Sequence, residues 1–230
     1  MTYTIINSNL LATSVSIQKQ ATEAKSSLHV SVNSKGKRLL DICGAIVGLG
    51  ITTILFVPIA VAIKLDSPGS ILFSQTRCGY KGKTFRIWKF RSMVTNASEL
   101  KYLVENKATG AFFKNECDPR ITRVGRFLRK TSLDEFPQFW NVLKGEMSLV
   151  GTRPPTCDEV ECYEENEMKR LDVKPGLTGE WQVNGRSKIT DFAEVLHLDL
   201  QYQKNWSLVY DLKLIFKTIG VIFSKKSGAC

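Results

Sequence analysis

Residues 131–135 place two neighbouring carboxylates, Asp134 and Glu135, directly behind a cluster of cations. Nearby cations keep a carboxylate ionised, and they also hold a phosphorylated substrate against it. An ionised carboxylate beside a phosphate serves as a nucleophile or as a ligand for a divalent metal. The pattern therefore predicts phosphoryl chemistry carried out by an aspartate. The cations, which we call the basic stripe, are Arg120, Arg123, Arg126, Arg129 and Lys130.

The same residues also have structural interpretations. Arginines at every third position suit a helix with one solvated cationic face. Residues 132–135 fit a helix capping box, in which Glu135 reaches back to the Ser132 amide. Pro137 favours a helix that starts nearer Asp134, because a proline beyond the first turn removes a backbone hydrogen bond. In either register, the positive end of the helix dipole favours the ionised form of Asp134.

Composition narrows the possible partners. A chain of 230 residues suits one domain with an ample core, and its formal charge of +10 calls for an anionic partner. Such a partner is a nucleic acid, an acidic membrane surface or a phosphorylated substrate. The presence of only two histidines makes a histidine-based triad or a multi-histidine metal site improbable. The six cysteines form no CxxC pair, which indicates reduced thiols in a cytosol-facing protein.

An apolar run without a charged residue extends over residues 42–63, long enough to cross a hydrocarbon core of ~30 Å. Pro58 removes the hydrogen bond to the Ile54 carbonyl, so we expect a kink there, with Thr52, Thr53 or a packed neighbour satisfying the freed groups. Cations flank both ends of the run, which places both ends on the cytoplasmic side. The pattern predicts a re-entrant helix that enters one leaflet and returns. The alternative is a buried helix of a soluble domain.

The flanking segments set the domain organisation. Residues 1–35 are rich in polar residues and are predicted to form a mobile N-terminal extension, followed by one membrane-anchored domain over residues 36–230. Residues 206–223 repeat apolar side chains every three or four positions, with Trp206 suited to headgroup depth. They fit a helix in the membrane interface or an amphipathic core helix. Residues 158–170 indicate an acidic, solvated surface helix.

A β-hairpin is expected between the apolar run and the basic stripe. Residues 71–73 and 85–90 have the composition of its two strands, with a turn at 81–83. Lys89 and Arg91 share one face of the second strand and are candidates for anion binding, or else are two solvated surface cations. Later turns, at 150–155, 174–179 and 184–187, present arginines and backbone amides that also suit anions.

Taken together, these segments resemble the bacterial sugar transferase family, the small monotopic polyprenyl-phosphate phosphoglycosyl transferases. The resemblance covers the chain from about residue 36 to the C-terminus, with the motifs in the order of the family. The segments that carry it lie at residues 37–41, 85–93, 118–125, 131–135, 141–148, 153–154, 174–176, 182–186 and 211–213.

The resemblance implies transfer of a sugar 1-phosphate from a nucleoside diphosphate sugar, such as a UDP-sugar, to a polyprenyl phosphate. This is the first membrane step of exopolysaccharide, capsule or glycan assembly. The resemblance also implies Mg²⁺ at Asp134 and Glu135, with Asp134 as the covalent nucleophile. Thr152 and Glu180 depart from the usual family residues and bear on substrate details. Family residues that contribute to the site correspond to Lys89, Arg129, Arg153, Arg186 and Asp199.

The expected fold is α+β and mainly helical. It is a monotopic membrane protein with an N-terminal re-entrant helix, a short β-hairpin and amphipathic interface helices around a cytoplasmic catalytic core. We expect it at the bacterial inner membrane, with a nucleoside diphosphate sugar, polyprenyl phosphate and membrane lipid as partners and without nucleic acid. The alternative is a membrane-anchored, non-catalytic protein whose basic face binds anionic lipid or nucleic acid. Hydrolysis of a nucleotide sugar is a lesser enzymatic alternative.

Overall fold

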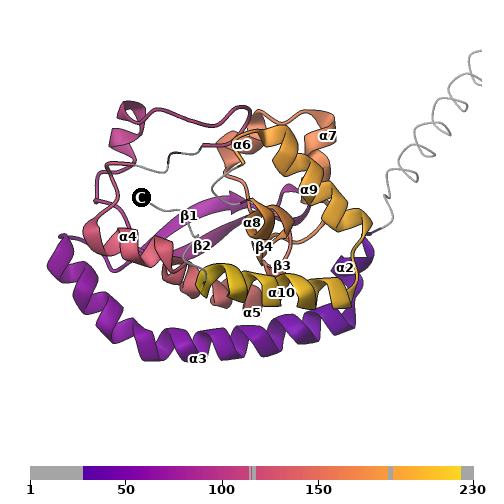
Figure 1. Ribbon diagram of the computed structural model, residues 1–230, viewed down its shortest axis with the longest axis horizontal. Helices are drawn as coiled ribbons and strands as arrows, with labels where there is room; N and C mark the ends of the chain where they lie inside the picture. Colours follow the sequence, from indigo (N-terminus) through magenta and orange to yellow (C-terminus); the bar gives the residue numbers. More distant parts are fainter. Residues whose placement is uncertain (1–27, 114, 116–117, 186–188, 224–230) are drawn as a thin grey trace, which may run out of the picture.

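The computed structural model describes residues 28–113, 115, 118–185 and 189–223. The fold is mainly helical, as expected, with the predicted hairpin and a second small sheet that was not predicted, and a long helix runs beneath the other elements (Figure 1). The elements are α2 (Val30–Asn33), α3 (Lys35–Asp66), β1 (Leu72–Cys78), η1 (Tyr80–Gly82), β2 (Thr84–Phe90), η2 (Glu99–Leu103), α4 (Arg123–Lys130), η3 (Leu133–Gln138), α5 (Phe139–Lys144), β3 (Ser148–Val150), α6 (Cys157–Glu161), α7 (Glu165–Met168), η4 (Lys169–Asp172), β4 (Gly176–Thr178), α8 (Glu180–Asn184), α9 (Phe192–Lys204) and α10 (Leu208–Phe223).

Helix α3 contains the whole apolar run and extends beyond it at both ends. The helix continues through Pro58, and Figure 1 shows it bowed beneath the molecule. The hydroxyls of Thr52 and Thr53 donate to the carbonyls of Gly48 and Leu49, one turn earlier. The expectation that these threonines satisfy the carbonyl freed by Pro58 was therefore wrong, because a threonine in a helix reaches back to position i−4.

One face of α3 packs against the rest of the domain along its length. Near its start, Asp41 accepts hydrogen bonds from the Ser148 hydroxyl and the Leu149 amide. At its end, Asp66 accepts one from the Val124 amide of α4. Because the contacts run from end to end, α3 lies along the domain instead of projecting from it. The opposite face exposes apolar side chains, namely Ile46, Val47, Ile51, Ile54, Val57, Val61 and Leu65.

The predicted hairpin is present and longer than expected. Strands β1 and β2 pair antiparallel from Leu72 opposite Phe90 to Cys78 opposite Thr84. A second, parallel pair joins β3 to β4. One core cluster links the two sheets to α3, α5 and α10, and its fully enclosed members include Ala45, Val142 and Met147.

Helix α10 divides its surface between the core and the exterior. Asp211 and Leu214 are buried, whereas Val209, Leu212, Phe216 and Ile219 are exposed. The buried residues confirm the core-facing side of an amphipathic helix, whereas a position in the membrane interface stays a prediction. Trp206 precedes the helix, and its indole N–H donates to Asp211 Oδ2 at 3.1 Å, so its side chain packs inward. The position of Trp206 at headgroup depth stays a prediction.

The predicted N-terminal extension and the predicted acidic helix both have other boundaries in the structure. Residues 1–27 lie outside the described part of the chain, but α2 is folded and His29 Nε2 lies 3.0 Å from the Gln203 carbonyl of α9. Packed structure therefore begins before residue 36. The single acidic helix expected over residues 158–170 is divided into α6, α7 and η4, because separate capping boxes start α6 and α7.

Candidate active site

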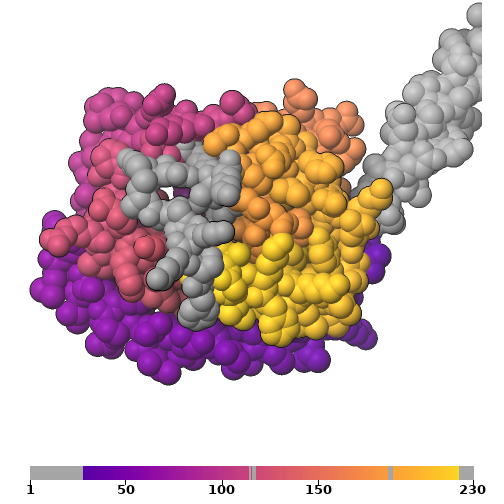
Figure 2. Space-filling view, in the orientation of Figure 1, coloured from indigo at the N-terminus to yellow at the C-terminus, as the bar shows by residue number. Residues whose placement is uncertain are grey.

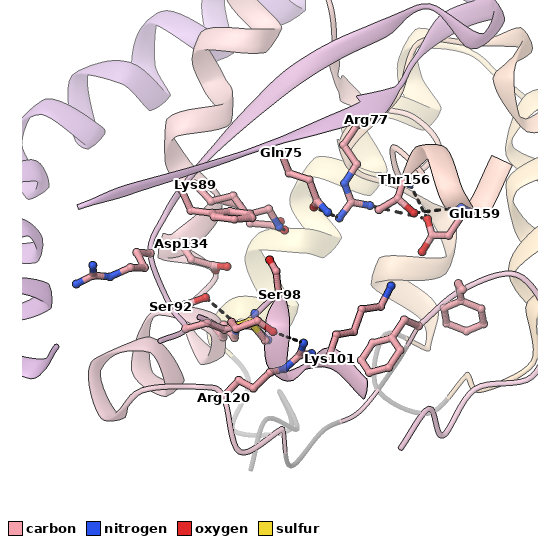
Figure 3. Close-up of a pocket in the computed structure, with 18 of the residues that line it drawn as sticks. Gln75, Arg77, Lys89, Ser92, Ser98, Lys101, Arg120, Asp134, Thr156 and Glu159 are labelled. Carbon is pink, nitrogen blue, oxygen red and sulfur yellow. Dashed lines mark hydrogen bonds and ion pairs between the residues drawn. The ribbon is translucent and has the colours of Figure 1, made fainter. Parts of the chain in front are cut away.

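A pocket of about 910 Å³ opens between the hairpin, η3, α6 and the segment before α4. Asp134 and Lys89 lie on one side of it, and Arg77 and Glu159 lie on the other (Figure 3). A smaller cavity of about 110 Å³ adjoins the same side chains and is lined by Arg77, Lys89, Glu135 and Arg153 among others. Cations from four different segments thus surround a dyad of carboxylates, as a binding site for a phosphorylated ligand requires.

The carboxylate dyad lies in the first turn of the 3₁₀-helix η3. Ser132 has a left-handed backbone (φ 57°) and makes no capping hydrogen bond with its side chain, so the capping-box interpretation was wrong. The physical reason is that Ser132 ends α4: its amide donates to the Arg129 carbonyl at 3.2 Å, and the left-handed turn redirects the chain. Such a conformation in a serine is strained, and strain of this kind clusters at functional sites.

Asp134 and Glu135 have different surroundings within this turn. Asp134 is buried, with 6% of its surface exposed, yet it lines the larger pocket. Glu135 lines both cavities, and its Oε1 accepts a hydrogen bond from Lys89 Nζ at 2.6 Å. The sequence prediction placed Lys89 and Glu135 at one site, and the structure brings them into direct contact. The ion pair with Lys89 orients the Glu135 carboxylate, which lies in the same turn as Asp134.

Helix α4 carries only part of the basic stripe to the pocket. Arg129 and Lys130 line it, and Arg129 Nε donates to Ser92 Oγ at 2.9 Å. Arg123 and Arg126 are exposed and are not among the lining residues. The interpretation of these arginines as a solvated cationic face is therefore confirmed for Arg123 and Arg126, which lie opposite the buried Gly125 and Leu128. On a helix with 3.6 residues per turn, residues 123, 126 and 129 spread over about 120° of the circumference, and only the last of them reaches the pocket.

Arg120, the remaining arginine of the stripe, precedes α4 and is buried. Its Nε and Nη2 donate to the two carboxylate oxygens of Asp118 at 2.9 and 2.6 Å, a bidentate ion pair. The close approach of α4 to this side of the pocket depends on Gly125. A Cβ atom there would lie 2.0 Å from the Ser92 carbonyl oxygen, so only glycine allows Arg129 to reach Ser92.

Two other predicted binding residues, Arg153 and Arg91, line the pocket but have different partners. Arg153 lines both cavities and remains a candidate for substrate contact. Arg91 also borders the pocket, but its Nη atoms donate to the carbonyls of Ser67 and Pro68, so it ties the hairpin to the end of α3. Arg186 lies outside the described residues.

Asp199 is placed within the protein interior. The side chain is 1% exposed, and its Oδ2 accepts a hydrogen bond from Arg170 Nε at 2.8 Å and forms an ion pair with Arg170 Nη2, also at 2.8 Å. Burial raises the pKa of Asp199 to about 6, although the ion pair with Arg170 opposes that shift. Neither residue is among those that line the two cavities. The structure therefore gives Asp199 a contact with another side chain of the core, and its predicted role in substrate binding has no geometric support.

The lining residues that the sequence analysis missed include Gln75, Arg77 and Glu159. The alternation of β1 places Phe73, Gln75 and Arg77 on one face, and the pairing of Phe73 with Lys89 makes it the face that carries Lys89. That pattern was a usable signal for Gln75 and Arg77. Glu159 offered no such signal, because it lies in a segment that has the composition of a solvated acidic surface.

The dyad has a donor set that fits Mg²⁺. This ion is commonly held by one or two carboxylates together with substrate phosphates, and it does not need a cage of protein ligands. Asp134 and Glu135 supply two carboxylates at the edge of one pocket. Within the described residues, no group of three or more His, Cys, Asp and Glu side chains forms a metal site. The residues present thus suit a metal that is shared with a phosphorylated substrate.

The described cysteines are free thiols, in line with the sequence prediction. They are Cys43, Cys78, Cys157 and Cys162. Cys78 and Cys157 approach each other, with 3.7 Å between their sulfur atoms, where β1 meets α6. Burial raises the pKa of the Cys78 thiol to about 11 and keeps it protonated at neutral pH. Cys117 and Cys230 lie outside the described residues.

The sequence of the chain is similar to those of several known proteins. The chain is 53% identical over 188 residues to galactosyl transferase CpsE of Streptococcus agalactiae, covering 81% of this chain and 42% of that protein. It is 43% identical over 204 residues to the UDP-glucose:undecaprenyl-phosphate glucose-1-phosphate transferase of Escherichia coli, covering 86% of this chain and 42% of that protein.

A relative of similar length also matches. The exopolysaccharide production protein ExoY of Rhizobium meliloti is 39% identical over 197 residues, which cover 83% of this chain and 87% of that protein. The chain therefore spans less than half of two of these relatives and most of the third. Residues 32–225 match the bacterial sugar transferase family, and the chain belongs to that family.

Proposed function

We propose that the chain transfers a sugar 1-phosphate from a UDP-sugar to a polyprenyl phosphate. The observation that carries this proposal is the buried Asp134 carboxylate beside the Lys89–Glu135 ion pair, on the wall of a pocket lined with cations. The reaction named for the Escherichia coli relative, from UDP-glucose to undecaprenyl phosphate, supports the same assignment. Its place would be the first membrane step of exopolysaccharide or related glycan assembly, as the name of the ExoY relative suggests.

In the proposed first half-reaction, an oxygen of the Asp134 carboxylate attacks the β-phosphorus of the UDP-sugar. The phosphorus–oxygen bond to UMP breaks, and the electron pair leaves with UMP. Arg129, Lys89 and Arg153 stabilise the charge that develops on the phosphate oxygens. Asp134 then carries the sugar phosphate as an acyl phosphate.

In the second half-reaction, a phosphate oxygen of the polyprenyl phosphate attacks the same phosphorus and releases the Asp134 carboxylate. Glu135, held by Lys89 at 2.6 Å, keeps a second carboxylate oriented beside the reacting group. In the first half-reaction, Mg²⁺ held by Asp134, Glu135 and substrate phosphates would supply positive charge to UMP as it leaves. The two steps predict ping-pong kinetics.

We further infer that α3 lies within one leaflet of the membrane. Within the described residues it is the helix long and apolar enough, by length and composition, to cross a bilayer, yet one of its faces packs along the domain. The opposite face exposes a continuous row of apolar side chains, which is typical of a membrane contact. In Figure 2, α3 forms the lower side of the molecule and α10 lies directly above part of it. The exposed apolar side chains of α10 would extend the same surface.

The transferase proposal is tested with purified protein in nanodiscs that contain undecaprenyl phosphate. UDP-glucose and UDP-galactose are supplied with Mg²⁺, and both UMP release and the lipid product are measured. We expect UMP release together with a sugar-phosphate lipid from at least one donor. Release of free sugar phosphate without the lipid would favour a hydrolase. Absence of UMP, with nucleic-acid binding that resists physiological salt, would support the non-catalytic alternative.

The membrane proposal is tested by labelling single cysteines at Lys35 and at Ser70 in a cysteine-free variant. Lys35 is the first residue of α3 and Ser70 follows its end, so a re-entrant helix leaves both on the cytoplasmic side. A membrane-impermeant maleimide should label neither site in intact cells and both sites after permeabilisation. Labelling of one site from outside would mean that α3 spans the membrane.

A further inference from the structure

Arg77 and Glu159 lie at the end of the pocket opposite Asp134 (Figure 3), and Arg153 joins them in a cluster of three charged side chains. Arg77 near the end of β1 and Arg153 after β3 share the carboxylate of Glu159, from α6. The distance from Arg77 Nη1 to Glu159 Oε2 is 3.8 Å, and that from Arg153 Nη1 to Glu159 Oε1 is also 3.8 Å. Each arginine therefore faces a different oxygen, and neither distance is short enough for a hydrogen bond.

Arg77 is fixed by its surroundings before any ligand binds. Its Nη1 donates to the Pro154 carbonyl at 3.0 Å, and its Nη2 donates to Gln75 Oε1 at 2.8 Å. Its Nε is buried, and no acceptor for it exists among the described residues. The protein thus orients this guanidinium without satisfying all of its donors. Incomplete satisfaction of a buried cation is costly, and a bound ligand that supplies the missing acceptor is one explanation.

Glu159 is fixed by the start of α6. Its Oε2 accepts a hydrogen bond from the Thr156 amide at 2.8 Å, and its own amide donates to Thr156 Oγ1 at 3.2 Å. This reciprocal pair is a capping box, and it sets the carboxylate between the two arginines as a consequence of starting the helix. The carboxylate position is therefore a property of the local fold.

The charges in this cluster do not balance. Two guanidinium groups share one carboxylate, and burial together with the charge of Arg153 lowers the pKa of Arg77 to about 10. Glu135 has the opposite effect on that pKa, which places the cluster within electrostatic range of the dyad. Arg77, Arg153 and Glu135 also line the same smaller cavity. An additional anion in this cavity would be favoured by both arginines.

We propose that Arg77 and Arg153 form a phosphate-binding subsite for the UDP-sugar, in which Glu159 competes with the substrate for the two guanidinium groups. Arg77 and Glu159 are new members of the binding site, and the proposal rests on the transferase function stated above. Two arginines match a phosphate because each presents paired donors to its oxygens. Glu159 limits the affinity, because a phosphate must share or replace the carboxylate as the partner of both cations.

This competition predicts that two substitutions change the affinity for UDP in opposite directions. Arg77→Gln removes the charge and should weaken UDP binding about 10- to 100-fold, as expected for loss of a hydrogen bond to a charged group. Glu159→Gln should instead strengthen UDP binding by several-fold, because glutamine serves equally in a capping box but does not compete as an anion. Arg77→Lys, which keeps the charge but not the fork of donors, should have an intermediate effect.

The experiment measures UDP and pyrophosphate affinity by titration calorimetry on the full chain in detergent, in addition to turnover. Arg126→Gln is the matched control, because it removes the same charge from an exposed residue that does not line the pocket. We expect the control to bind UDP within about twofold of the wild type. Circular dichroism identifies any variant that does not fold, and Glu159→Gln then provides the test.

The binding measurement separates this proposal from the transferase proposal. If UDP binding responds as predicted but no lipid product forms, the subsite stands and the reaction assignment fails. If turnover is found but Arg77→Gln and Arg126→Gln bind UDP equally well, the subsite is refuted and the reaction stands. Weaker UDP binding by Glu159→Gln would refute the competition, because it would make Glu159 a supporting contact.

Discussion

Lys37 and Arg77 are both buried cations that face a carboxylate, but their surroundings differ. Lys37, at the start of α3, donates to Asp211 Oδ2 at 2.6 Å, to the Val150 carbonyl at 2.9 Å and to the Tyr202 hydroxyl at 3.3 Å. An ammonium group has three donors, and each has a partner. The other Asp211 oxygen accepts a hydrogen bond from the Tyr202 hydroxyl at 2.7 Å. The cluster joins α3, β3, α9 and α10.

Arg77 has a carboxylate at 3.8 Å, a donor without an acceptor and a second arginine for a neighbour. The difference indicates how buried charges divide between stability and function in this fold. Where every charged atom has a partner, the cluster holds helices together. Where partners are missing, the side chains line a pocket and are available to a ligand.

Asp134→Asn should have the largest effect, and only on activity. The amide keeps the shape of the side chain but cannot act as the nucleophile, so turnover should fall by more than about 10⁴-fold, the size of loss that follows removal of a nucleophile. Thermal unfolding in detergent should remain close to that of the wild type. UMP release measured with a UDP-sugar is the readout. Normal turnover by this variant would exclude Asp134 as the nucleophile.

Lys37→Met should have the opposite profile, with a large effect on stability. Removing one partner of a buried ion pair leaves the Asp211 carboxylate without its cation, at a cost of about 3–5 kcal/mol. Chemical unfolding followed by circular dichroism measures the loss. The double variant Lys37→Met, Asp211→Leu should recover much of it, since no buried charge is left alone. An unchanged unfolding midpoint for the single variant would show that the cluster is not structural.

Two glycines of α3 provide a smaller, matched comparison of its two faces. A Cβ atom on Gly48 would lie 2.4 Å from the Phe139 ring, whereas nothing lies within 4 Å of one on Gly50. Gly48→Ala should destabilise the protein by about 1–3 kcal/mol through overpacking. Gly50→Ala should stabilise the helix by up to about 1 kcal/mol. Equal effects would mean that α3 does not pack against α5 as described.

The smallest effect is expected for an ion pair at the surface. Lys81 Nζ lies 2.6 Å from Asp172 Oδ1, but the two side chains are 40% and 39% exposed. Asp172→Asn should change the free energy of unfolding by less than about 1 kcal/mol, and added salt should remove even that difference. A loss as large as that of Lys37→Met would show that burial does not decide the strength of these pairs.

The sequence predicted the elements that depend on local patterns. The uncharged run forms part of one long helix, and the alternating residues form the hairpin. The adjacent carboxylates lie in the first turn of a helix. Lys89 and Glu135, which are 46 positions apart, were assigned to one site by resemblance to a family, and the structure adds their contact.

The missed features depend on tertiary contacts that no local pattern encodes. The capping-box motif at Ser132 is overridden because the same residue must end α4. Glu159 and Asp158 are adjacent acidic residues, and only the start of α6 at Thr156 decides which of them faces the arginines. Asp199 fits a family position, but the burial of Arg170 beside it could not be read from the chain.

The covalent role of Asp134 is tested most directly by mass spectrometry of the intact protein. The protein is mixed with Mg²⁺ and UDP-glucose or UDP-galactose, without a polyprenyl phosphate acceptor, and is quenched with acid. The proposed mechanism predicts a mass increase equal to one sugar phosphate, mapped to the peptide that contains Asp134, and its loss when undecaprenyl phosphate is added. An enzyme that forms the lipid product through a ternary complex, with no adduct on Asp134, would contradict the mechanism.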